Sequence, residues 1–316
     1  MAQDNSQTTP TFGVLQALKA GFDLTTKHWW LLLLPILLDS FLWIGVRLRI
    51  AQPIRNFYTS ILAQVPANTS ILPPDGLEQF YLILDRTNLF TMLSVPVLGI
   101  PILMGGGSLE KVPLLPNEVL LAPIGRIIQT GLFLLIFGLL LSGFYYALIA
   151  HALTEDSTWN TFFYKLPQRI SRMILLGILI YLLLLLIIFP LIFGASIVGL
   201  INLSFASLLI IGGSVFVMWA VIFSSFSAQA MLLEHLTPLT AIKRSFKFVK
   251  ANLNRTLPLL LVVLFANSLL NSLWLLADNG TWLTFISIVG HAFIATSFIA
   301  ATFIFFKEHA LSPARV

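Results

Sequence analysis

Six stretches of the chain are long and apolar enough to cross a lipid bilayer, and this feature constrains the fold more than any other. A hydrocarbon core of ~30 Å requires about 20 helical residues, because unpaired backbone groups are not tolerated there. The stretches are residues 29–46, 127–150, 173–195, 204–231, 257–277 and 282–306. The sequence therefore predicts an all-α, polytopic integral membrane protein with six transmembrane helices.

Composition excludes the main alternatives to a membrane protein. Of 316 residues, 58% are hydrophobic, 10% are charged and none is cysteine, whereas soluble domains carry about 25% charged residues. A soluble enzyme, a disordered chain and a disulfide-stapled domain are all excluded. Lys and Arg outnumber Asp and Glu by 18 to 13, an excess that favours a cytoplasmic membrane face over a nucleic-acid partner.

The distribution of Lys and Arg predicts the orientation. With a cytoplasmic N-terminus, the 18 basic residues divide into 12 on the inner side and 6 on the outer side, as the positive-inside rule favours. Arg47, Arg49 and Arg55 follow the first span and favour the opposite orientation locally. The whole-chain count predicts that both termini lie in the cytoplasm. The membrane itself is expected to be a bacterial-type cytoplasmic membrane.

A repeated segment precedes the first and fifth spans. Residues 15–24 (LQALKAGFDL) align with residues 239–248 (LTAIKRSFKF), and a weaker third copy lies at 161–172. A spanning stretch follows each copy. The repeat predicts three units, each an amphipathic cytoplasmic-interface helix followed by a two-span hairpin.

The best copy has the features of a helix lying at a membrane interface. Thr237 followed by Pro238 suits a helix start, and the apolar residues recur at three- and four-residue steps from Leu239 to Leu253. We expect the opposite face to contact anionic headgroups. That face carries Lys243, Arg244, Lys247 and Lys250.

The segment 241–252 (AIKRSFKFVKAN), which runs into a Leu-rich span, resembles a pattern in certain bacterial membrane proteins. These are the membrane domains fused to glycerophosphodiester phosphodiesterases and their stand-alone multi-pass relatives of unknown function. The resemblance implies a helical multi-pass architecture and no defined catalytic residues. The phosphodiesterase barrel itself is not expected in this chain.

Two regions lie outside the spans. Residues 1–10 are polar and predict a disordered tail, which leaves 11–316 as a single membrane domain. In the outer loop, 51–123, the spacing of Leu77, Phe80, Tyr81 and Leu84 predicts a surface helix. Residues 93–104 are apolar but too short to span and contain Pro and Gly, so they are re-entrant or surface-lying. A membrane-hugging lid is favoured over a substrate-binding loop.

Four polar residues fall near the predicted bilayer midplane. Asp39 lies ten residues into the first span, and an ionisable group at that depth costs about 2.5–3.5 kcal/mol unless it faces a partner. An intramembrane polar cluster is predicted, either as interhelical contacts, which is favoured, or as a transport site. Its members are Asp39, Asn267, Asn271 and His291.

Signals for catalysis or cofactor binding are weak. The sequence has no metal-ligating His pair on a helix and no phosphate-binding Gly loop, so no metal or cofactor is expected. His151, Glu155 and Asp156 group near one span end, where capping explains them. Ser214 and His291 are similar in placement to the dyad of rhomboid intramembrane proteases, but Val215 and Ala292 depart from that family's motif.

These patterns favour a non-catalytic scaffold or accessory subunit of a membrane complex. The alternative is a transporter of a small solute or lipid that uses the midplane cluster, and a rhomboid-like serine protease is third. Expected partners are anionic membrane lipids and other membrane subunits, with no nucleic acid.

Overall fold

The computed structural model describes residues 13–64, 74–95, 97–105, 117–154, 158–199, 201–276 and 280–311. The predicted tail at 1–10 lies outside these ranges, as do Glu155 and Asp156. Helices dominate the described chain. Five are long and apolar enough to cross a membrane, or six if one sharply bent pair forms a single span.

The five long segments correspond to predicted spans two to six. The fourth predicted span is divided at Ser225 and Phe226 into α7 and the short α8. The sixth predicted span continues into a π-helical turn at Lys307–Leu311. Their bounds are α5, Ile124–Leu153; α6, Trp159–Gly199; α7, Leu203–Ser224; α8, Ser227–Leu233; α10, Leu253–Trp274; and α11, Leu283–Phe306.

The first predicted span is not one straight helix. It comprises the 3₁₀ turn η1 (Trp29–Leu32) and α2 (Leu33–Ile44), and it meets the preceding α1 (Val14–Lys27) at 93°. Helix α1 packs along α11, where a Cβ at Gly21 would lie 2.3 Å from the Ser297 carbonyl. The first copy of the repeat is therefore fixed against a spanning helix by close backbone contact.

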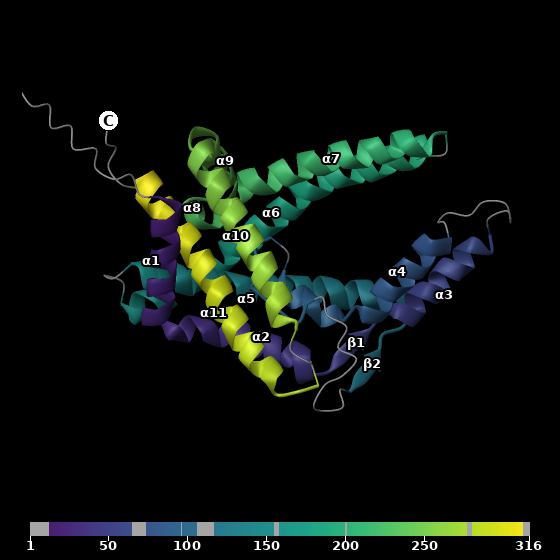
Figure 1. Cartoon of the computed structure of the whole chain (residues 1–316), viewed down its shortest axis with the longest axis horizontal. Coiled ribbons are helices and arrows are strands. Elements are labelled where there is room, and N and C mark those ends of the chain that lie inside the picture. The colour runs from purple at the N-terminus through teal and green to yellow at the C-terminus, as the bar shows by residue number, and fades with distance from the viewer. Residues whose placement is uncertain are drawn as a thin grey trace, which may run out of the picture.

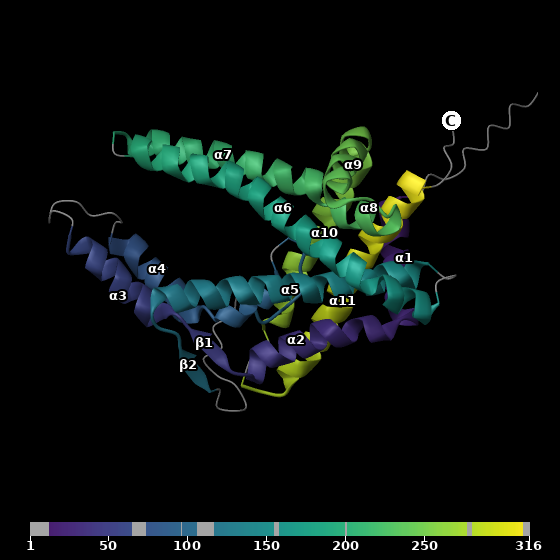
Figure 2. The same ribbon diagram turned by 180° about the vertical axis from the view of Figure 1, so that it is seen from behind.

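The most extensive helix contacts join α1 with α11, α6 with α7 and α5 with α6, and α10 packs against α11 as a further pair of consecutive helices. In Figures 1 and 2 the α6–α7 pair extends from the body of the molecule, and its turn lies at the end away from the C-terminus. Residues 161–172, predicted as a third interface helix, form the first part of the continuous 41-residue α6. That copy has no helix break after it, unlike the other two.

Helix α9 (Pro238–Ala251) begins where Thr237 and Pro238 predict a start. The Thr237 hydroxyl does not cap the helix backbone but contacts the Thr240 hydroxyl at 2.8 Å. Ser245, buried on α9, donates to the Phe223 carbonyl at 2.7 Å and accepts from the Phe226 amide at 3.1 Å. The break between α7 and α8 is thus held by a hydroxyl from α9.

The described residues between 47 and 123 include two α-helices and a two-stranded sheet. Helix α4 (Pro74–Arg86) confirms the predicted surface helix, and it packs against α3 (Ala51–Leu62). Strand β1 (Arg47–Arg49) pairs in parallel with β2 (Glu118–Leu120). The three arginines that follow the first span are held here: Arg47 and Arg49 lie in β1, Arg49 pairs with Glu118 at 2.7 Å, and Arg55 pairs with Asp85.

Residues 89–105 enter the interior of the molecule. The 3₁₀ helix η2 (Leu89–Ser94) lies against α5, where a Cβ at Gly138 would lie 2.8 Å from the Met92 and Leu93 carbonyls. The chain then turns, with Val95 and Val97 in the left-handed region at φ of 50° and 72°. The segment beyond the turn is buried at Leu98, Ile100, Leu103 and Met104. We call residues 97–105 the inserted segment.

Candidate functional site

Asp39 connects α2 to the inserted segment. Its carboxylate is fully buried and accepts hydrogen bonds from the backbone amides of Leu103, at 2.8 and 2.9 Å, and of Met104, at 2.9 Å. Charge-assisted bonds of this length are the stronger class of hydrogen bond. A buried carboxylate needs such partners, and here the main chain supplies them.

His291 on α11 is the second neighbour of Asp39. The His291 Nδ1 lies 3.7 Å from Asp39 Oδ2, beyond hydrogen-bond distance, and the imidazole is 3% exposed. The structure therefore brings together α2, α11 and the inserted segment around one carboxylate. From the sequence, His291, an asparagine or a hydroxyl could be the partner of Asp39, and of these the structure places His291 beside it. The two backbone amides were not predicted, because they have no side-chain signature.

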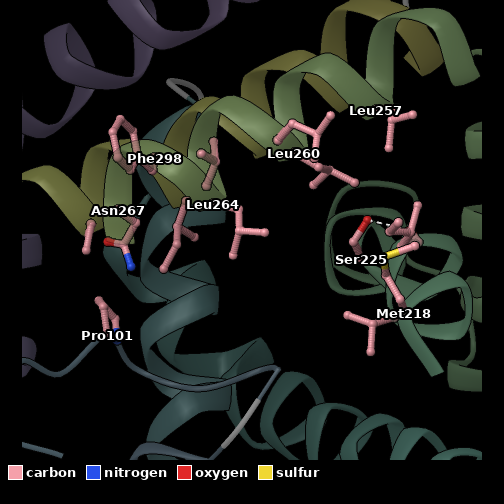
Figure 3. Close-up of a pocket in the computed structure, with 14 residues that line it drawn as sticks. Pro101, Met218, Ser225, Leu257, Leu260, Leu264, Asn267 and Phe298 are labelled. Atoms are coloured by element: carbon pink, nitrogen blue, oxygen red, sulfur yellow. Dashed lines mark hydrogen bonds between the residues drawn. The ribbon is translucent and has the colours of Figure 1, made fainter. Parts of the chain in front are cut away.

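The two asparagines lie elsewhere. Asn267 lines a cavity beside Pro101 of the inserted segment (Figure 3). Asn271, one turn further along α10, has a buried Oδ1 with no hydrogen-bond partner among the described residues. Of the predicted four-residue cluster, Asp39 and His291 are thus brought together, while the side chains of Asn267 and Asn271 form no hydrogen bond with either of them among the described residues.

The cavity beside Asn267 is apolar and has a volume of about 500 Å³, within the usual range for ligand sites. It lies between α7, α10 and α11, and Pro101 closes one side (Figure 3). Asn267 and Ser225 are the polar residues that line it; the others are Pro101, Met218, Val221, Ile222, Leu257, Leu260, Leu261, Val263, Leu264, Ala295, Phe298 and Ile299. We call this space the apolar cavity.

Further polar pairs join the helices, and the sequence analysis did not single them out. The Tyr145 hydroxyl on α5 donates to Thr296 on α11 at 2.8 Å. Gln229 on α8 is hydrogen-bonded to Thr302 on α11 at 2.9 Å. Each is a polar residue in a long apolar segment, which is the signal that could have identified it.

The basic face of α9 is divided. Lys243, Lys247 and Lys250 are exposed, as expected for headgroup contacts. Arg244 instead forms an ion pair with Glu234 at 2.9 Å and donates to the Ala310 carbonyl at 3.3 Å. Arg244 therefore holds α9 against the end of α8 and the C-terminal turn rather than pointing toward headgroups.

The structure does not assemble the Ser–His arrangement. Ser214 is exposed on α7 and donates to the Ile210 carbonyl of its own helix at 2.7 Å, whereas His291 is buried beside Asp39. His151 contacts the rings of Trp159 and Phe162. Among the described residues, no group of three or more His, Cys, Asp or Glu is placed to hold a metal ion.

The fold and the site define a helical protein with several helices able to cross a membrane, in which polar groups in the long segments bond the helices and one inserted segment together. No protein-family model matches the chain, and neither the curated proteins nor the solved structures give a significant match.

Proposed function

We propose that this chain is a non-catalytic multi-pass membrane protein that acts as a scaffold or accessory subunit of a membrane complex. The observation that carries the proposal is the burial and hydrogen bonding of the Asp39 carboxylate. A site that transports an ion through a charged group must leave that group accessible, yet the Asp39 carboxylate is fully buried and bonded to the Leu103 and Met104 amides. The Asp39 carboxylate therefore bonds the inserted segment to α2.

The α6–α7 pair supports a role in assembly. It extends from the body of the molecule (Figure 1). In the most apolar 18-residue stretch of the α7–α8 segment, only 6% of the residues are buried within the chain. Phe216 on α7 is 72% exposed. We propose another membrane subunit as the occupant of this face, in a complex that also contacts anionic lipids through α9. The three-unit arrangement of interface helices and two-span hairpins belongs to the same proposal.

Photo-crosslinking in the native membrane tests the scaffold role. A photoreactive residue at Phe216 should give one discrete protein adduct, while the same residue at Phe133 on α5, which is 65% exposed, should give lipid adducts only. Lipid adducts alone at both positions would contradict the proposal.

The orientation is testable because the chain has no cysteine. We propose that both termini are cytoplasmic and that α3 and α4 are outside, in line with the positive-inside count. Gln64→Cys should react with an impermeant thiol reagent in intact cells, and Lys250→Cys should react only after the membrane is opened. The reverse pattern would invert the topology.

A second candidate function, lipid handling, is favoured by the apolar cavity. Its volume of about 500 Å³ and its largely aliphatic lining suit an acyl chain, and Asn267 offers one amide to a polar group. Purified protein should retain a lipid that native mass spectrometry detects. Leu264→Trp should displace that lipid, and Leu269→Trp, on the exposed side of α10, should not. Equal retention in both variants would remove this candidate.

A further inference from the structure

A second, polar cavity lies at the other end of α5 from the outer loop. It has a volume of about 750 Å³ and lies between the end of α5, the start of α6, α8 and the C-terminal turn. One wall is apolar and comes from α1, α5 and α8. Its described lining residues are Leu24, Ala150, Ala152, Leu153, Thr154, Thr158, Thr161, Lys165, Arg169, Leu232, Leu233, His235 and Lys307. We call it the basic cavity.

Cations converge on the basic cavity from two separate parts of the chain. Lys165 and Arg169 come from α6, and Lys307 comes from the end of α11. Arg172 joins Lys165, Arg169 and His235 around a smaller adjoining pocket. Neither set of described lining residues includes a carboxylate. The result is a concentrated positive potential in a concave site.

The acidic residues next to the cavity in sequence are engaged, exposed or outside the described chain; Glu308, beside Lys307, and Asp23, beside Leu24, are exposed and do not line it. Glu234, which precedes His235, is committed to Arg244 at 2.9 Å. Glu155 and Asp156 lie outside the described residues. Among the groups that the structure places here, no anion balances the cations.

One donor in the cavity is buried and unused. The Arg169 Nη1 has no hydrogen-bond partner among the described residues, and the guanidinium lies 5.9 Å from the Phe162 ring centre. Two of the other cations are held in place by backbone: Arg172 donates to the His235 carbonyl and Lys307 to the Leu153 carbonyl, each at 3.1 Å. A buried guanidinium donor without an acceptor is costly, so a ligand that supplies one is favoured.

The hydroxyls add directional donors beside the cations. Thr158 and Thr161 share one hydrogen bond at 3.0 Å, so the pair retains one hydroxyl hydrogen for an anion. His235 is fixed at φ of 56° by its position between α8 and α9. Cations with adjacent hydroxyl donors match the several acceptor oxygens of a phosphate group.

We propose that the basic cavity binds a phosphate group, with Arg169 and Lys165 as its principal contacts and Lys307 and the Thr158–Thr161 pair completing the site. Two sources share this chemistry. One is the headgroup of an anionic phospholipid, whose glycerol end would lie against the apolar wall at Leu24, Leu232 and Leu233. The other is free phosphate from the aqueous side.

Two assays on the full-length protein distinguish the sources. Calorimetric titration with inorganic phosphate in lipid-free detergent tests the free anion. Native mass spectrometry after reconstitution with phosphatidylglycerol or with phosphatidylcholine tests the headgroup. Phosphate binding, or preferential retention of phosphatidylglycerol, supports the site and identifies its source. Absence of both overturns it.

Charge-matched variants locate the binding. Lys165→Gln/Arg169→Gln should weaken the observed binding by about tenfold or more, as expected for loss of charged hydrogen bonds. Arg86→Gln/Arg126→Gln removes the same charge from exposed positions on α4 and α5 that do not line the cavity, and it should leave binding within about twofold, since exposed charges are screened. An equal loss in both variants would assign the binding to general surface charge and overturn the proposal.

A milder variant keeps the test decisive if removal of Arg169 prevents folding. Lys165 is exposed, so Lys165→Gln should unfold at the wild-type temperature and still weaken binding several-fold. Unchanged binding in Lys165→Gln would remove Lys165 from the site and with it the proposal.

Discussion

Asp39 and Arg169 are both charged residues in a largely apolar chain, and their surroundings differ. Asp39 is fully buried, with two backbone amides bonded to its carboxylate. Arg169 faces a cavity, with a buried Nη1 that has no hydrogen-bond partner among the described residues. A buried charge with its partners in place stabilises the fold, whereas a cation with unused donors is available to a ligand.

The largest effect is expected from the loss of Asp39. Asp39→Leu leaves the Leu103 and Met104 amides unpaired in the interior, at about 1–3 kcal/mol for each amide. Thermal unfolding of the detergent-purified variant, followed by tryptophan fluorescence, should show a clear fall in Tm, with Asp39→Asn milder because its carbonyl still accepts. Asp23→Leu, at an exposed position on α1, is the control. A wild-type Tm for Asp39→Leu would show that the hydrogen bonds from the Leu103 and Met104 amides to Asp39 contribute nothing to stability.

Substitution of Gly138 tests the packing of α5 against η2, which precedes the inserted segment. A methyl group there would lie 2.8 Å from two η2 carbonyls, so Gly138→Ala should destabilise the protein by about 1–3 kcal/mol through overpacking. Gly125, in the same helix, has no such atoms within 4 Å. Gly125→Ala should therefore be neutral or stabilising, by up to about 1 kcal/mol. Equal unfolding temperatures for the two variants would refute the close packing of α5 on η2.

In the basic cavity around Arg169, anion binding should depend on pH through His235. Burial lowers the pKa of His235, and the nearby cations of Arg169, Lys165 and Arg172 lower it further. A bound anion offsets those cations and raises this pKa, so binding takes up a proton and affinity should rise several-fold from about pH 8 to about pH 5.5.

Sulfate is the suitable probe, because its charge is constant over that range. His235→Gln, which leaves the cations Lys165, Arg169, Arg172 and Lys307 in place around the cavity, should bind sulfate with a nearly flat pH profile. A steep profile that persists in His235→Gln would assign the titration to another group.

The smallest effect on stability is expected from the lysines of α9. Lys243, Lys247 and Lys250 are exposed, so changing all three to Gln should leave Tm unchanged and weaken binding of the protein to anionic vesicles by about 1 kcal/mol per lysine, less at high salt. Arg244→Gln should instead lower Tm, because it removes the partner of the half-buried Glu234. Equal effects from lysines and arginine would show that the basic face is uniform.

The apolar stretches predict most of the helices, because length and composition alone decide whether a segment can span a bilayer. The buried faces were harder to predict. The repeat aligns Leu15 with Leu239, yet both are exposed, at 80% and 55%. The buried residues are Ala17, Gly21 and Thr25 in α1 and Pro238, Ala241, Ser245, Phe248 and Val249 in α9. In a membrane the larger apolar side chains can face lipid, while small residues permit close helix contact.

The same limit applies to the sites. The depth of Asp39 in an apolar stretch predicts a partner, but backbone amides 64 and 65 residues away carry no sequence signal. From the sequence alone, the predicted interface helix at 161–172 has a polar face formed by Lys165, Arg169 and Arg172. Only the tertiary structure adds Lys307 and His235 and converts that face into a cavity.

Hydrogen exchange at the inserted segment tests most directly whether Asp39 acts as a structural clamp. Mass spectrometry of the purified protein should show slow exchange in peptides that cover Leu103 and Met104. In Asp39→Leu those peptides should exchange much faster, while peptides from α7, which does not contact Asp39, keep their wild-type rates. Unchanged exchange at Leu103 and Met104 in Asp39→Leu would contradict a structural role for the carboxylate and favour a functional one.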